Sequence, residues 1–146
     1  MIRLGTRKDN RFIYKMVVQE LLPYAIQVRP ETSVSRAEIE RRLTKMEVWI
    51  ACRHPNGKPA GFLSFQKHGG QIKIDMLAVS RNYQSRGYGE DLMKALERFA
   101  ENHKADTISL YVDEINEGAI RFYTRLGYTV SAYFPDLKCY SLSKKL

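Results

Sequence analysis

Apolar side chains recur along the chain with two periods, and each period predicts one type of secondary structure. In the segment Ile72–Val79 every second residue is apolar and β-branched residues are frequent, which is the pattern of a β-strand. Other runs rich in apolar or β-branched residues predict further strands. These runs are Met1–Arg7, Val48–Arg53, Pro59–Lys67, Thr107–Val112, Tyr128–Phe134 and Lys138–Ser143.

Apolar residues spaced three or four apart predict helices. The first helix runs from Arg11 to about Tyr24, and Pro23 bends or stops it. The second begins after Ser35, because Ser35 and Glu38 have the spacing of a capping box. Two more helices span Gly87–His103 and Asn116–Leu126.

Turn signals between the strands indicate how the strands connect. Asn56-Gly57 and Gly69-Gly70 separate three successive strands, which predicts an antiparallel meander. The strand Thr107–Val112 follows a helical crossover, so we expect it to run parallel to Ile72–Val79. A last hairpin turns at Pro135-Asp136. Since the 146 residues contain no internal repeat and no long linker, they predict a single α+β domain over residues 1–146.

Composition and net charge indicate the cellular location and the kinds of partner to expect. The 44% hydrophobic and 27% charged residues suit a globular protein, and no apolar run approaches the roughly 20 residues that span a bilayer. The two cysteines, Cys52 and Cys139, lack metal-ligand spacing, so we expect buried free thiols, no metal and a cytoplasmic location. The net charge of +8 predicts attraction to anions but does not identify the anion, since the basic residues form no clustered stripe.

A loop between the strand at 72–79 and the third helix carries the first chemical signal. The segment Gln84–Gly89, Q-S-R-G-Y-G, has two glycines one residue apart at the start of a helix. Unpaired N–H groups and the positive end of the helix dipole make such a position suitable for phosphate. The loop is not a dinucleotide-binding fingerprint, because position 92 is Leu92, and it lacks the Gly-Lys-Ser/Thr of a P-loop. Taken alone, the two glycines are equally compatible with a simple turn.

A second motif lies downstream. Residues Asn116–Tyr128 match N-x-x-A-x-x-F-Y-x-x-x-G-F/Y at every position. This motif follows a Q/R-x-x-G-x-G loop that itself follows a strand ending in Leu-Ala-Val, and the two motifs in this order resemble those of the GNAT N-acetyltransferase superfamily. The element order of the whole chain resembles that superfamily as well.

The resemblance implies a mixed, mostly antiparallel central sheet flanked by about four helices, with a splayed parallel strand pair forming a cleft for acetyl-coenzyme A. A β-bulge commonly makes that opening, and the sequence does not show one. The resemblance also implies that strand backbone binds the pantetheine arm, that an N–H near Leu77 polarises the thioester carbonyl, and that loop amides hold the pyrophosphate. The implied cofactor-binding residues are Leu77, Ala78, Val79, Gln84, Ser85, Arg86, Gly87, Tyr88, Gly89, Asn116 and Tyr123.

Direct transfer of acetyl from a thioester to an amine, which the resemblance implies, needs two proton transfers: the ammonium loses a proton and the thiolate gains one. Tyr123 matches the superfamily's general acid, and a core aromatic is the alternative interpretation. Asn116 either contacts the pantetheine or only caps a helix. Asp75 is the candidate base, and a surface ion pair with Lys73 or with a cation of a neighbouring strand is the alternative. Glu114 and Glu117 are weaker candidate bases, because acidic residues are common in loops and in the first turn of a helix.

The implied acceptor is a primary amine, and the compact length favours a small molecule. The alternatives are a peptide N-terminus or lysine as acceptor, or a coenzyme A-binding regulatory module without turnover. Nucleic acid and a membrane are not expected partners, and a homodimer stays open. The superfamily usually selects its acceptor with the segments that match Gln27–Ser33 and Tyr133–Lys138 here. Candidate selectors are Arg29, Glu31, Tyr133 and Asp136. Arg81 and Arg86 are either phosphate contacts or solvated surface charges.

Overall fold

A computed structural model describes all 146 residues. Its strands are β1 (Ile2–Leu4), β2 (Glu47–Cys52), β3 (Pro59–His68), β4 (Gln71–Val79), β5 (Thr107–Asp113), β6 (Thr129–Phe134) and β7 (Cys139–Lys145). They form one seven-stranded sheet in the order β1-β2-β3-β4-β5-β7-β6. Only β4 and β5 pair in parallel, and all other neighbours are antiparallel. The structure thus confirms the predicted meander, the parallel crossover and the final hairpin.

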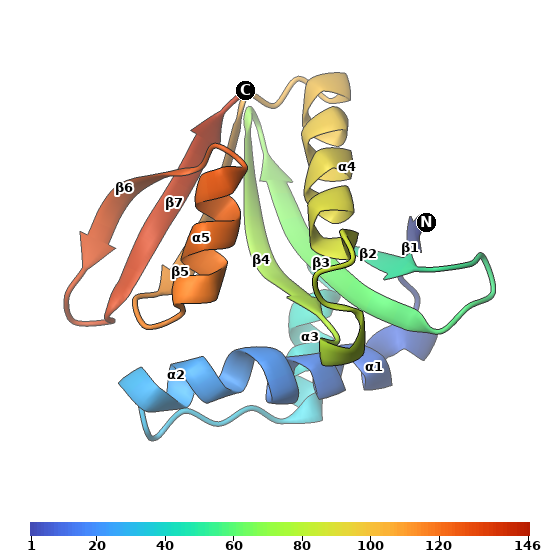
Figure 1. The fold of residues 1–146 in the computed structure, drawn as a ribbon, viewed down its shortest axis with the longest axis horizontal. Helices are drawn as coiled ribbons and strands as arrows, with labels where there is room; N and C mark the ends of the chain where they lie inside the picture. The colour runs from blue at the N-terminus through green and yellow to red at the C-terminus, as the bar shows by residue number, and fades with distance from the viewer.

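Helices lie on both faces of the sheet and across one end of it. They are α1 (Asn10–Met16), α2 (Leu22–Val28), α3 (Arg36–Leu43), α4 (Tyr88–Asn102) and α5 (Glu117–Arg125). Figure 1 shows α4 and α5 in front of the sheet, while α1 and α2 run across its lower end. Because α1 and α2 belong to one continuous helix, these segments correspond to the four predicted helices.

The first helix extends further than its sequence predicts. It runs on from α1 through a π-helical turn at Val17–Leu21 into α2, and it ends at Val28 rather than near Tyr24. Pro23 does not stop it, because Pro23 lies in the first turn of α2, directly after the π-helical turn, where the spacing of the helical hydrogen bonds changes. The N–H of Leu22 donates to the carbonyl of Val17, which is the wider spacing of a π-helix.

Two apolar clusters lie on opposite faces of the sheet. The larger one joins α4 and α5 to one face, and the smaller one joins α1 and α3 to the other. Four alternating residues of β4 are buried, as the strand pattern predicts, but they divide between the two clusters. Ile72 and Ile74 belong to the larger cluster, and Met76 and Ala78 belong to the smaller one.

The change of face within β4 results from a β-bulge. Ile74 pairs with Phe65 of β3 and Met76 pairs with Ser64, so Asp75 has no partner residue on β3. One unpaired residue reverses the side to which all later residues of a strand point. The sequence pattern alone did not show this bulge.

The bulge coincides with the point at which β4 and β5 separate. The parallel pairing extends only from Gln71–Thr107 to Lys73–Ser109. Beyond these pairs the two strands diverge toward the α1–α2 end of the molecule, as Figure 1 shows. The splayed parallel pair that the resemblance implies is therefore present.

Two smaller expectations can be compared with the structure. Cys52 and Cys139 are both buried and unbonded, which confirms the prediction of free thiols. None of the helices combines the length and the apolar composition needed to cross a membrane.

Candidate active site

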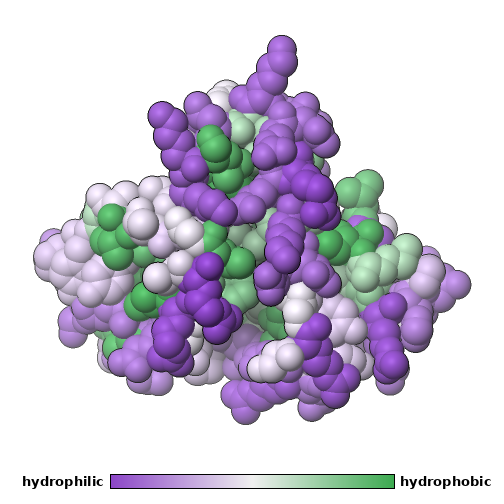
Figure 2. Space-filling model, turned by 45° about the horizontal axis from the view of Figure 1, so that its top comes forward, coloured by the Kyte–Doolittle hydropathy of each residue, from purple (hydrophilic) through white to green (hydrophobic).

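A cavity of about 1010 Å³ opens where β4 and β5 diverge. Its walls come from the end of β4, the loop before α4, one side of α5 and the π-helical turn that precedes α2. Figure 2 shows that this molecule's surface is largely hydrophilic, with hydrophobic residues visible between projecting polar side chains. The cavity brings together segments that are distant in the sequence.

The first wall is the end of β4. Leu77, Ala78 and Val79 pair with β3 along one edge, and they have no partner strand along the other, because β5 has already diverged. All three residues line the cavity. A strand edge without a partner exposes N–H and C=O groups in a regular row, and this is suited to an extended ligand.

The second wall is the glycine-containing loop. Gly87 has a φ of 87° and Ser85 has a φ of 64°, so the chain is left-handed at both positions. The backbone N–H groups of residues 85–90 donate to no other group of the protein. Successive unpaired N–H groups at the start of the 15-residue helix α4 are an arrangement suited to an anion.

Gly89 is needed for a different reason. A Cβ atom built there would lie 3.2 Å from the ring of Phe122 on α5, so its role is the close approach of α4 to α5. Arg86 does not line the cavity, and its guanidinium lies 5.7 Å from the ring centre of Tyr83. Gln84, Ser85, Gly87, Tyr88 and Gly89 do line it.

The third wall is α5. Asn116 caps this helix, since its side-chain oxygen accepts a hydrogen bond from the N–H of Ala119 at 3.2 Å, and it also lines the cavity. Tyr123 lines the cavity while only 5% of its surface is exposed. Burial raises the pKa of the Tyr123 hydroxyl above its usual value, because a phenolate would be poorly solvated there. Tyr123 therefore keeps its proton at neutral pH and is available as a donor.

Asp75, the candidate base, does not line the cavity. Both of its carboxylate oxygens accept hydrogen bonds from the guanidinium of Arg42 on α3, one of them at 2.7 Å. The structure thus gives Asp75 the ion-pair role that the sequence left open as the alternative, although its partner is neither Lys73 nor a cation of a neighbouring strand. Since the bulge lies at Asp75 itself, this carboxylate is turned toward α3.

The structure adds one acidic residue that sequence reasoning missed, Glu20. It lies on the π-helical turn, its side chain is 13% exposed, and it lines the cavity. Its Oε2 accepts a hydrogen bond from the side chain of Gln84 at 3.1 Å, whereas its Oε1 is buried without a hydrogen-bond partner. A charged residue between Val17 and Leu22, in an otherwise uncharged stretch of a predicted helix, was the available signal.

The segments expected to select the acceptor are in contact with each other. Arg29, which follows α2, donates to Asp113 at the end of β5 at 2.9 Å and to the carbonyl of Leu137 in the last hairpin. In the same region the Tyr133 hydroxyl donates to Glu114 at 2.6 Å, and this bond raises the pKa of Tyr133 to about 12. Arg81 lines the cavity, as a phosphate contact would.

The fold and the site now define the class of protein. The sequence profile of the acetyltransferase (GNAT) family matches residues 14–128. The chain therefore belongs to the acetyltransferase (GNAT) family, which confirms the resemblance drawn from its two motifs. Over 60 residues it is 37% identical to a probable spermine N(1)-acetyltransferase of Bacillus subtilis subsp. natto, a match that covers 40% of this chain and 40% of that protein.

Solved structures show the same fold over the whole chain. Ard1 from Thermoplasma volcanium matches with a TM-score of 0.80 at 22% identity, covering 100% of this chain and 97% of that one. The PaiA N-acetyltransferase from Thermoplasma acidophilum, solved in complex with coenzyme A, matches with a TM-score of 0.79 at 16% identity, covering 100% and 98%. These likenesses confirm the predicted fold class.

Proposed function

We propose that this protein transfers an acetyl group from acetyl-coenzyme A directly to the primary amine of a small molecule. Family membership supports the reaction class, and the cavity supports the two substrates. The single observation that carries the proposal is that one cavity combines an unpartnered strand edge, a loop with free backbone N–H groups and a protonated tyrosine.

The cavity residues fit coenzyme A. The free N–H groups of residues 85–90 suit its pyrophosphate, and Arg81 lines the same cavity. The open edge at Leu77, Ala78 and Val79 suits the amides of the pantetheine arm. Asn116 contributes a side-chain amide from the opposite wall. When bound, acetyl-coenzyme A supplies an activated thioester, whose carbonyl carbon the amine attacks.

The residues of this chain then have distinct parts in the transfer. A backbone N–H at Leu77 stabilises negative charge on the carbonyl oxygen as the amine attacks. The Tyr123 hydroxyl donates to the departing sulfur, since it remains protonated over the whole neutral range. Asp75 has no part in this transfer, because its carboxylate is bound by Arg42 and lies outside the cavity. The acceptor ammonium therefore loses its proton to water at the mouth of the cavity before it attacks.

A small acceptor is favoured over a peptide by the bonds of Arg29. They join the end of α2 to β5 and to the β6–β7 hairpin, across separations of 84 and 108 residues. The resemblance assigns acceptor selection to the segments that contain Arg29 and Leu137, and a bond between them leaves less room for an extended peptide. The weak sequence likeness to a probable spermine N(1)-acetyltransferase points toward amines of low molecular mass as well.

Release of free coenzyme A thiol, measured with polyamines, aminosugars, amino acids and short peptides, tests the proposal. We expect turnover with a small amine and no turnover with peptides. Coenzyme A binding without thiol release from any amine would favour the alternative of a regulatory module.

The part of Tyr123 is tested by Tyr123→Phe, which should reduce kcat by about a hundredfold and leave coenzyme A affinity within about threefold. Tyr128→Phe is the matched control, since the Tyr128 hydroxyl is also buried but has no hydrogen-bond partner. It should leave kcat unchanged. Equal turnover in the Tyr123→Phe variant and the wild type would remove Tyr123 from the mechanism.

A further inference from the structure

The carboxylate of Glu20 is the only acidic group in the cavity that is mostly buried and has one oxygen without a hydrogen bond. The other acid in the cavity wall, Glu90, is 49% exposed and forms an ion pair with Lys94 on the surface of α4. A buried carboxylate oxygen without a hydrogen bond is unfavourable, and such groups usually have a ligand or a function. Glu20 also lies on a π-helical turn, which is a frequent feature of functional sites.

The cation now beside this oxygen is weakly held. The Nε of Arg81 lies 3.3 Å from Oε1 of Glu20, but the geometry does not make a hydrogen bond. Arg81 is 77% exposed, so its charge is solvated and its attraction to Glu20 is small. Another cation with better geometry can therefore take its place, and a phosphate at the loop would draw Arg81 away.

The position of Glu20 separates it from the reacting centre. One amide nitrogen of Gln84 donates both to Oε2 of Glu20 and to the carbonyl of Val79, at 3.1 and 2.9 Å. Val79 is two residues beyond Leu77, which is about 7 Å along a strand. A positive group bound by Glu20 is therefore not the amine that attacks beside Leu77, but a second group of the same acceptor.

We propose that Glu20 binds a second ammonium group of the acceptor, so that the preferred substrates are diamines and longer polyamines. This inference rests on the proposed acetyl transfer to a small amine and identifies its substrate class. The second ammonium supplies the charge-assisted hydrogen bond that Oε1 lacks, and it replaces Arg81 beside the carboxylate.

The test compares 1,5-diaminopentane with pentylamine, which lacks the second amine. In the wild type, kcat/KM should be higher for the diamine. Glu20→Gln should lower kcat/KM for the diamine by about thirtyfold and for pentylamine by less than about threefold. Glu40→Gln removes the same charge from a surface ion pair with Arg36, outside the cavity, and should change neither value.

Three results would overturn the inference while leaving acetyl transfer in place. The first is an equal loss for both amines in Glu20→Gln, which would make Glu20 a base or a positioning residue. The second is a loss of coenzyme A affinity in this variant, which would assign Glu20 to the phosphate loop through Gln84. The third is a wild type that does not prefer the diamine. If the wild type binds coenzyme A and acetylates neither these amines nor spermidine, the proposed function itself fails.

Discussion

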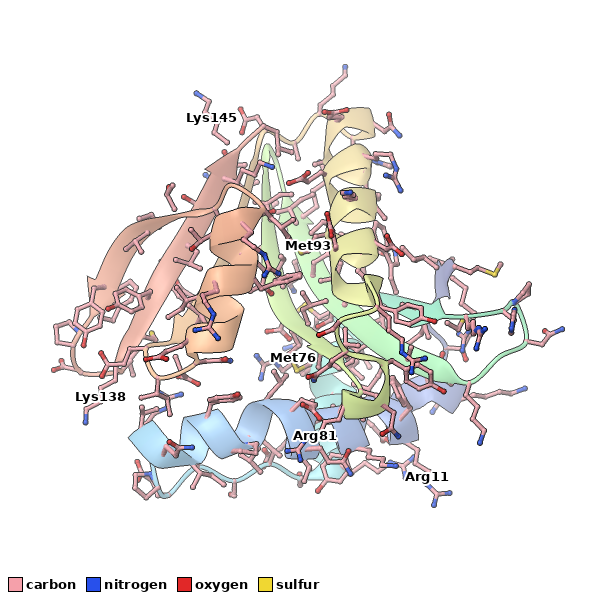
Figure 3. The ribbon with its side chains drawn as sticks, viewed as in Figure 1. Arg11, Met76, Arg81, Met93, Lys138 and Lys145 are labelled. Carbon is pink, nitrogen blue, oxygen red and sulfur yellow. The ribbon has the colours of Figure 1, made fainter.

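The two ends of the β4–β5 pair are made from the same two strands, but their buried groups are arranged in opposite ways. At the paired end, Ile72 lies beside Ile108 in the parallel ladder, and both side chains are fully buried in the larger apolar cluster. At the open end, the N–H groups of residues 85–90 and one oxygen of Glu20 have no hydrogen-bond partner. Figure 3 shows that open end with Met76 and Arg81 labelled beside it.

The paired end of β4 therefore contributes to stability, and its open end is available for binding. A group that has a partner in the folded protein contributes to folding, whereas an unpartnered group is available to a ligand and, where it is buried, lowers the stability of the ligand-free protein. The bulge at Asp75 marks the boundary between the two ends. Substitutions on either side of it should therefore have different consequences, and they test the comparison directly.

The largest effect is expected at the paired end. Ile108→Ala should lower the free energy of unfolding by about 3 kcal/mol, because it leaves a cavity in a fully buried cluster. Urea denaturation measures this loss. Leu137→Ala, at a position that is 51% exposed in the last hairpin, is the control and should change stability by less than about 0.5 kcal/mol. A comparable loss in both variants would contradict the assignment of stability to the paired end.

Two glycines allow the two ends to be compared directly, because both have a positive φ and they lie at opposite ends. Gly69, in the turn between β3 and β4, has a φ of 59° and Gly87 has a φ of 87°, and a Cβ atom at either would meet nothing within 4 Å. Gly69→Ala and Gly87→Ala should therefore each cost about 1 kcal/mol of stability through backbone strain. Only Gly87→Ala should weaken coenzyme A binding, as measured by calorimetry.

If the two alanine variants bound coenzyme A equally well, the loop at Gly87 would not hold the cofactor. If only one of them lost stability, backbone strain would not explain the requirement for glycine.

The sequence predicted the paired end better than the open end, for physical reasons. Strand alternation and the glycine turns depend on neighbouring residues, so they identified β4, its parallel partner and the loop at Gly87. The bulge depends on the register against β3, which no local pattern encodes, so the direction of Asp75 could not be predicted. Glu20 was missed because it enters the cavity only through the π-helical turn, and Pro23 suggested an end to that helix.

The smallest effect is expected for Asp75→Asn, at the boundary between the two ends. Arg42 is 49% exposed, so losing its ion pair with Asp75 should cost no more than about 1 kcal/mol of stability. Because Asp75 lies outside the cavity, kcat should stay within about twofold of the wild type, in contrast to the loss expected for Tyr123→Phe. The measurement is thiol release at several pH values, together with urea denaturation. A large fall in kcat with unchanged stability would restore Asp75 as the base, and it would show that the carboxylate leaves Arg42 and turns toward the open end when the substrates bind.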